Sequence, residues 1–177
     1  MKKFASVAAA AAALSVLVCA SGASAQTAAT WSPTVDGWNL SGLLSMNQSV
    51  NVDCQLDVEA KTTSTTTGQI NSFVLTPAPT LLCSSLTPSS LPWSIEPLKN
   101  ASTGQYFIRI NNLHVTTSLG YCQGDVVGEW FNVPQNLVFT GATVDGKVFG
   151  FDAPCTIDGE VHATPARANA SSPLIIS

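Results

Sequence analysis

Charged residues are scarce in this chain, and basic residues are the scarcest. Asp, Glu, Lys and Arg together make up only 10% of the 177 residues. Proteins that bind nucleic acid or anionic lipid need clustered Lys and Arg to neutralise phosphate charge. Here the basic residues beyond the N-terminus stand singly, at Lys61, Lys99, Arg109, Lys147 and Arg167. The sequence therefore argues against a nucleic acid partner and against an anionic lipid surface.

The side chains that usually carry catalysis or hold metals are also few. The chain has two histidines, His114 and His162, and neither has an acidic or cysteine ligand at metal-binding spacing. No Gly-rich phosphate loop, G-x-S-x-G elbow, HExxH helix or EF-hand loop occurs. We therefore expect no catalytic residue, no cofactor and no metal site.

Carboxylates do recur at short spacing in two places, for which the functional alternatives are an acidic metal site and a glycosidase pair. Asp53, Asp57 and Glu59 share one face of a predicted strand, and Asp158 and Glu160 lie two residues apart. A solvated strand face explains both groups more simply, because alternate residues of a half-buried strand face water.

Long apolar runs are confined to the N-terminus. Met1-Lys2-Lys3 precedes an Ala, Val and Leu-rich run from Phe4 to Ala20, and small residues follow at Ala23-Ser24-Ala25. This is the organisation of a bacterial secretory signal, so residues 1–25 are predicted to be removed by cleavage after Ala25. A lipidated cysteine normally follows Gly, Ala or Ser, whereas Val18 precedes Cys19, so we do not expect Cys19 to be lipidated. We expect a secreted or cell-surface protein whose later apolar runs are too short to span a membrane.

Loss of Lys2 and Lys3 with the signal would leave five basic residues against eleven acidic ones, a net charge of −6. The remaining cysteines are four in number, which in an exported protein predicts two disulfides. Three pairings are possible. The similar spacing within Cys54–Cys83 and Cys122–Cys155 favours these two pairs. A zinc site is disfavoured because no C-x-x-C occurs.

Period-two alternation of apolar and polar residues dominates the rest of the chain, and helical periodicity is absent. Val50 to Glu59 alternates over ten residues, which is typical of a half-buried antiparallel strand. Asp145-Gly146 predicts a two-residue hairpin turn joining Leu137–Val144 to Lys147–Phe151. We predict an all-β antiparallel sandwich of the Greek-key or immunoglobulin-like type, with about seven to nine strands. It would span residues 47–165, between an N-terminal flank (26–46) and a C-terminal tail (166–177).

Tryptophans are the feature that most suggests recognition. Trp93 and Trp130 lie in predicted core segments. Trp31 and Trp38 instead lie in the N-terminal flank with Leu43 and Leu44. These four flank residues form a candidate hydrophobic contact for a neighbouring molecule or an oily surface.

Three stretches resemble the secreted family called protein activator of alkane oxidation. They are LCSSLTPSSLPW at 82–93, YCQG at 121–124 and CTIDGEVHATP at 155–165. Asp158-Gly159-Glu160 departs from the less acidic Ser-Gly-Thr-like turn expected there. The resemblance implies a small exported β protein linked to growth on alkanes and to the biofilm matrix, with no catalytic residues to carry over.

Three functions follow in order of preference. The first is a non-enzymatic surface or matrix protein that assists contact with hydrophobic material. The second is a self-assembling fibre or pilus-like subunit, in which the flank from Trp31 to Met46 adds a strand to the next copy. The third is an extracellular hydrolase, ranked last because no nucleophile can be paired with a base.

Overall fold

The computed structural model describes residues 25–32, 37–77, 81–166 and 173–177. The predicted signal falls almost entirely outside these ranges. Within them the protein is built from antiparallel strands and one short 3₁₀ helix, η1 (Leu81–Ser85). No helix of the described part is long and apolar enough to cross a membrane.

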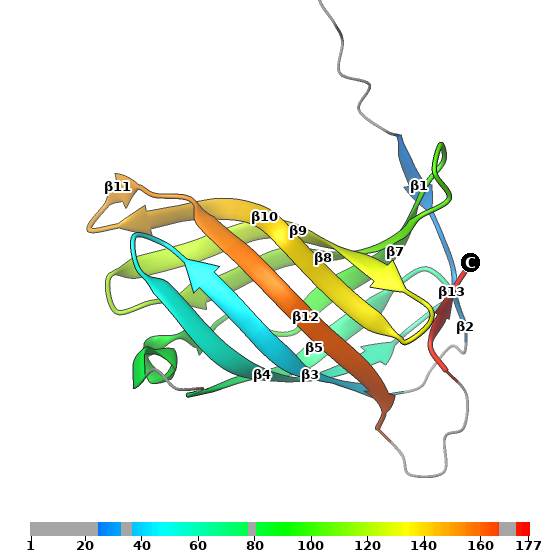
Figure 1. Cartoon of the computed structure of the whole chain (residues 1–177), viewed down its shortest axis with the longest axis horizontal. Coiled ribbons are helices and arrows are strands. Elements are labelled where there is room, and N and C mark those ends of the chain that lie inside the picture. Colours follow the sequence, from blue (N-terminus) through cyan, green and yellow to red (C-terminus); the bar gives the residue numbers. More distant parts are fainter. Residues whose placement is uncertain (1–24, 33–36, 78–80, 167–172) are drawn as a thin grey trace, which may run out of the picture.

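Eight strands close into a single barrel (Figure 1). In ring order the barrel strands are β7 (Trp93–Asn100), β5 (Gly68–Pro77), β4 (Asn51–Thr62), β3 (Gly37–Asn47), β12 (Cys155–Pro165), β10 (Asn136–Val148), β9 (Gly120–Phe131) and β8 (Tyr106–Thr116). Pairing of β8 with β7 completes the ring. The predicted sandwich is therefore wrong, although the all-β class is right.

The pairing of β3 with β12 shows why the sheet closes rather than splitting into two layers. These strands are paired from Trp38–Pro165 to Asn47–Thr156, so the first and last barrel strands share almost their whole length. β3 also pairs with β4 over its full length. Closure leaves no long open edge on β3. The N-terminal flank predicted for residues 26–46 thus contributes a wall strand to the barrel.

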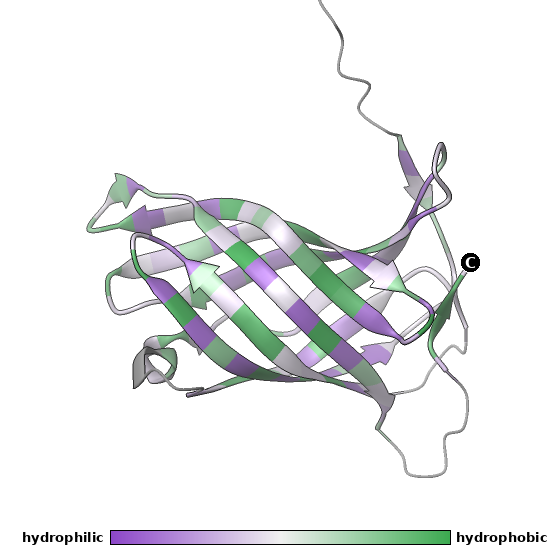
Figure 2. Cartoon of the chain, in the orientation of Figure 1, coloured by the Kyte–Doolittle hydropathy of each residue, from purple (hydrophilic) through white to green (hydrophobic). Residues whose placement is uncertain are grey.

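The interior of the barrel is the hydrophobic core. Along β4, Val52, Cys54, Leu56 and Val58 face inward and are buried, while the residues between them face outward. Figure 2 shows this alternation as green and purple bands along the strands. The alternation predicted from the sequence is confirmed, but it now lines one interior rather than the gap between two sheets.

One seam of the barrel is covered by a loop instead of being fully paired. β5 meets β7 only through Gly68–Ile70 and Trp93–Ile95. Beyond this point η1 packs against β5, and the short strand β6 (Thr87–Pro88) pairs with β8. The Cys54–Cys83 disulfide ties η1 to β4. The segment at residues 82–93 (LCSSLTPSSLPW) therefore covers the incompletely paired boundary between β5 and β7.

Both disulfide pairings predicted from spacing are confirmed. Cys54 is bonded to Cys83, and Cys122 to Cys155. All four cysteines are buried. The second bond links β9 to β12 across β10, which lies between them in the sheet.

The chain termini plug one end of the barrel. β1 (Gln26–Ala28) pairs with the end of β7, and β2 (Trp31–Ser32) pairs with β13 (Ile175–Ile176). Trp31 and Ile176 are 3% and 1% exposed. Part of the predicted C-terminal tail is thus packed against the barrel (Figure 1). We call the paired strands β2 and β13 the terminal plug.

Candidate functional site

Exposed apolar side chains gather at the end of the barrel opposite the terminal plug. Four residues form this group, which we call the apolar rim: Val50, Leu119, Phe149 and Phe151. Phe149 and Phe151 are 74% and 78% exposed. They lie on the hairpin of β10 and β11 (Phe151–Asp152), which projects furthest at that end and is green near its tip in the hydropathy view, beside purple polar positions (Figures 1 and 2).

The hairpin turn is formed by Phe149 and Gly150, not by Asp145 and Gly146 as predicted. Val148 pairs with Phe151 and Lys147 with Asp152, which leaves two residues in the turn. Their φ angles are 50° and 85°. Two successive positive φ values are what a type I′ turn requires. Phe149 adopts this conformation even though such a φ is costly for a bulky residue.

Asp145-Gly146 lies within strand β10, and Gly146 packs closely against its neighbours beneath the rim. It pairs with Cys122 on β9. A Cβ at this position would lie 2.6 Å from Gln48 Nε2 and 2.7 Å from Cys155 Sγ. Real Cβ atoms essentially never approach so closely, so this glycine serves close packing rather than a turn.

Gln48 binds the main chain that supports the rim. Its side-chain amide is nearly buried and its Nε2 lies within hydrogen-bond distance of three main-chain carbonyls, those of Tyr121 (2.9 Å), Ala153 (3.1 Å) and Lys147 (3.2 Å). These acceptors belong to β9, to the connection before β12 and to β10. One side chain from the β3–β4 turn therefore holds the base of the exposed hairpin.

Two further contacts fix the hairpin. The Phe149 N–H donates to the Leu119 carbonyl over 3.0 Å, which joins it to the β8–β9 turn. Lys147 Nζ lies 3.1 Å from an Asp152 carboxylate oxygen. The hydrogen bond and the charge of Asp152 raise the pKa of Lys147 above its ordinary value. Two opposite charges on this hairpin are therefore paired with each other.

Val50 and Leu119 border a shallow hollow of about 90 Å³ on the same end of the barrel. Its floor includes Met46, Leu86 and Cys122. The rim is thus a continuation of the hydrophobic core to the surface, with the two phenylalanines standing beyond it.

The flank residues predicted as a hydrophobic contact have separate environments. Trp31 lies in the terminal plug, and Trp38 and Leu44 are buried on the inner face of β3, at 2% and 5% exposure. Leu43, on the outer face, is exposed between Glu160 and Gln55 of the neighbouring strands. The structure does not bring these four residues together on one surface.

The barrel interior is too small to be a site for a long chain. Its cavity measures about 60 Å³ and is lined mainly by aliphatic and aromatic side chains, Trp38, Leu56 and Phe139 among them. An apolar cavity of about 150 Å³ is the size that admits benzene. A contact with larger apolar material must therefore use the outside of the protein.

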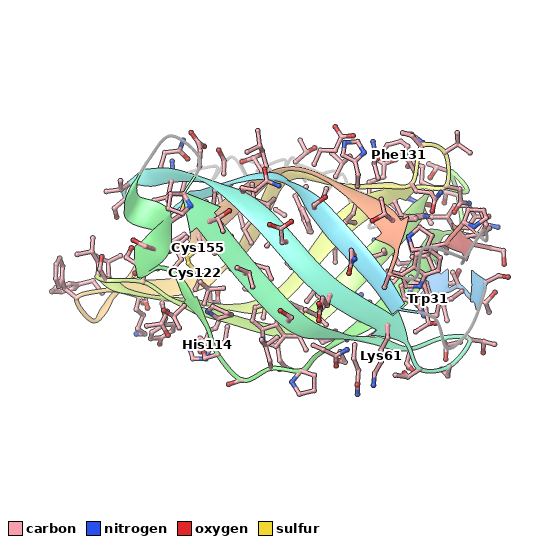
Figure 3. The ribbon with its side chains drawn as sticks, turned by 90° about the horizontal axis from the view of Figure 1, so that it is seen from below. Trp31, Lys61, His114, Cys122, Phe131 and Cys155 are labelled. Carbon is pink, nitrogen blue, oxygen red and sulfur yellow. A yellow bond between two sulfur atoms is a disulfide. The ribbon has the colours of Figure 1, made fainter. Side chains whose placement is uncertain are left out.

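The acidic and histidine residues weighed as catalytic or metal-binding lie on the barrel wall. His114 lies on the outside of the barrel (Figure 3). Its ring meets that of Tyr121 edge to face, with the centroids 5.7 Å apart. Glu160 accepts from Asn136 and lies 3.8 Å from His162. Asp158 accepts from the Gly141 N–H over 2.6 Å, at a bulge in β10. Across the described ranges, no group of three or more His, Cys, Asp or Glu is placed to hold a metal ion.

The acidic departure at Asp158-Gly159-Glu160 thus has a structural explanation. The two carboxylates bind β10 groups. Gly159, within β12, has a φ of 141°, and a Cβ at this position would lie 2.2 Å from the Leu43 carbonyl oxygen on β3. This segment is a continuous part of strand β12 opposite the β10 bulge, rather than a turn.

The rim was missed by sequence reasoning because its members lie in three separate turns. The Phe149-Gly150-Phe151 triplet carried a signal, since two phenylalanines flanking a glycine near a predicted turn are exposed if the turn shifts by a few residues. Asp145-Gly146 is the stronger turn signal in the sequence, and it places the predicted turn four residues too early.

A family described as "Alkane oxidation protein activator PraA/PraB-like" matches residues 1–169 of the chain. No curated protein and no solved structure gives a significant match.

Proposed function

This chain belongs to the PraA/PraB-like family of alkane oxidation protein activators, and from this membership we propose that it is a secreted, non-enzymatic protein whose apolar rim contacts hydrocarbon. By holding hydrophobic material at the cell surface or in a biofilm matrix, it would assist growth on alkanes. The single observation that carries this proposal is the pair of exposed phenylalanines, Phe149 and Phe151, on a fastened hairpin.

Rigid support makes this exposure meaningful. A mobile loop can fold its apolar side chains back onto the protein. Here Gln48 holds the base of the hairpin, and the Leu119 carbonyl accepts a hydrogen bond from its turn. Burying a phenylalanine side chain in an apolar phase is worth roughly 1.5–3 kcal/mol. Two such side chains, presented without an ordering cost, would give useful adsorption.

The charge around the rim favours a neutral apolar surface over a lipid headgroup surface. Lys147 is paired with Asp152, and the rim residues themselves are uncharged. Attraction to anionic lipid requires unpaired clusters of Lys and Arg. The rim carries no nucleophile or base, which supports a binding role.

Adsorption to hexadecane droplets tests the proposal. The oxidised protein, purified as its cells process it, is mixed with droplets and its depletion from the aqueous phase is measured. We expect F149S/F151S to adsorb at least tenfold more weakly than the unaltered protein. The matched control is L43S/V74S, which removes two exposed apolar side chains from the barrel wall. Equal adsorption by F149S/F151S and the unaltered protein, with both folded by circular dichroism, would exclude the rim as the contact.

A further inference from the structure

Two more large apolar side chains are exposed at the opposite end of the barrel. Phe131 ends β9 and Val133 lies in the β9–β10 turn, and they are 41% and 87% exposed. Figure 3 shows Phe131 toward the end that holds Trp31 and away from the Cys122–Cys155 disulfide. Of the eight large apolar side chains exposed in the described part of the chain, six therefore lie at the two ends of the barrel.

The turn that carries Val133 is fastened on both sides. Asn132 Oδ1 accepts from the Ile176 N–H (2.9 Å) and from Trp130 Nε1 (2.8 Å), and its Nδ2 donates to the Ile176 carbonyl (2.9 Å). Gln135 Oε1 accepts from the Leu174 N–H over 3.0 Å. Both polar neighbours of Val133-Pro134 thus hold the terminal plug, while Val133 itself projects into solvent.

The chemistry of this second patch matches that of the rim. No charged residue occurs from Phe131 to Asn136. The patch offers at most roughly 300 Å² of apolar surface, well below the ~800 Å² per partner of a stable protein interface. It is also a projecting turn, which a flat protein surface cannot enclose. A fluid hydrocarbon surface can deform around it, and an uncharged turn suits such a surface.

We propose that Phe131 and Val133 form a second hydrocarbon-contact site, so that one molecule can bridge two apolar surfaces. This inference rests on the proposed function of the rim and extends it. The two sites lie at opposite ends of the long axis of the barrel (Figure 1), so a droplet at the rim leaves the second site free. The protein would then link droplets to one another.

The test separates adsorption from bridging. Hexadecane droplets are coated below saturation with the oxidised protein, and droplet clustering is followed by light scattering and microscopy while depletion measures adsorption. We expect the unaltered protein to cluster droplets. F131S/V133S should still adsorb, within about threefold of the unaltered protein, but lose clustering. F149S/F151S at equal surface coverage should also lose clustering, and L43S/V74S should retain it.

Each outcome bears on one of the two proposals. Adsorption of the unaltered protein without clustering, or clustering by F131S/V133S equal to that of the unaltered protein, overturns bridging and leaves the rim intact. No adsorption by the unaltered protein overturns both. Concentration-dependent dimerisation in sedimentation that is lost in F131S/V133S would assign this end to a second copy of the chain and overturn its assignment to hydrocarbon.

Discussion

The Phe149 N–H donates to the Leu119 carbonyl over 3.0 Å, and this bond joins two turns whose side chains are both apolar and exposed. Phe149 makes this bond with a φ of 50°, a conformation that favours Asn or Gly over Phe. A residue that is poorly suited to this backbone conformation thus occupies one of the two most exposed positions of the rim.

Replacing Phe149 with Asn should therefore separate stability from function. We expect F149N to raise the free energy of unfolding by about 1 kcal/mol, because Asn adopts positive φ more readily. The same change should weaken adsorption to hexadecane droplets. F151N is the matched control, since Phe151 lies in strand β11 and has no such backbone strain. It should weaken adsorption without the gain in stability measured by urea unfolding.

Removing the Gln48 amide should loosen the rim. Q48A leaves the partly buried carbonyls of Tyr121 and Lys147 without this donor, which we expect to cost about 1–3 kcal/mol in urea unfolding. Amide hydrogen exchange in β11 should also become faster. Q123A, a change at an exposed position of β9, serves as the control. Unchanged exchange in β11 of Q48A would show that the hairpin is held by other contacts.

Gly146 should tolerate no side chain. G146A would place a methyl group against Gln48, Cys155 and the Ala153 carbonyl, so we expect a loss of at least 2 kcal/mol or failure to fold. G150A meets no atom within 4 Å and differs only in its positive φ of 85°, so it should cost about 1 kcal/mol. Equal unfolding midpoints for the two variants would contradict the close packing described for Gly146.

The two disulfides should stabilise the barrel similarly but protect different parts. Each closes a loop of about 30 residues, for which chain entropy predicts roughly 3–4 kcal/mol. C54S/C83S should increase hydrogen exchange in β5 and η1, because it releases the seam cover. C122S/C155S should increase exchange in β9 and β12. Identical exchange changes in the two variants would mean that the barrel opens as a single unit.

The strands and disulfides could be predicted because their signals are local. Alternation from Val52 to Val58 requires only that one face of a strand be buried, and the similar spacing of the cysteine pairs narrows three connectivities to one. Alternation cannot distinguish a sandwich from a barrel, because both bury one face of each strand. The choice is made by long-range pairing such as that of Leu40 with Ala163.

The apolar surface was harder to predict for the same reason. Trp31 is buried by Ile176 and its neighbours at the other terminus, and Trp38 by the interior of a barrel that the sequence does not reveal. The rim depends on where β10 ends, and β10 continues past Asp145-Gly146 because Val148 can still pair with Gly120. Exposure of Phe149 thus follows from register, which no single turn motif determines.

The arrangement of the terminal plug sets the direction in which the protein can be displayed. β1, β2 and β13 all lie at the end away from β11, the strand that begins at Phe151 (Figure 1). A reporter or a solid support joined at Ser177 would therefore point the aromatic hairpin outward. Beads coated in this way would form an oriented array, in which every molecule presents the same two phenylalanine rings to the surrounding liquid.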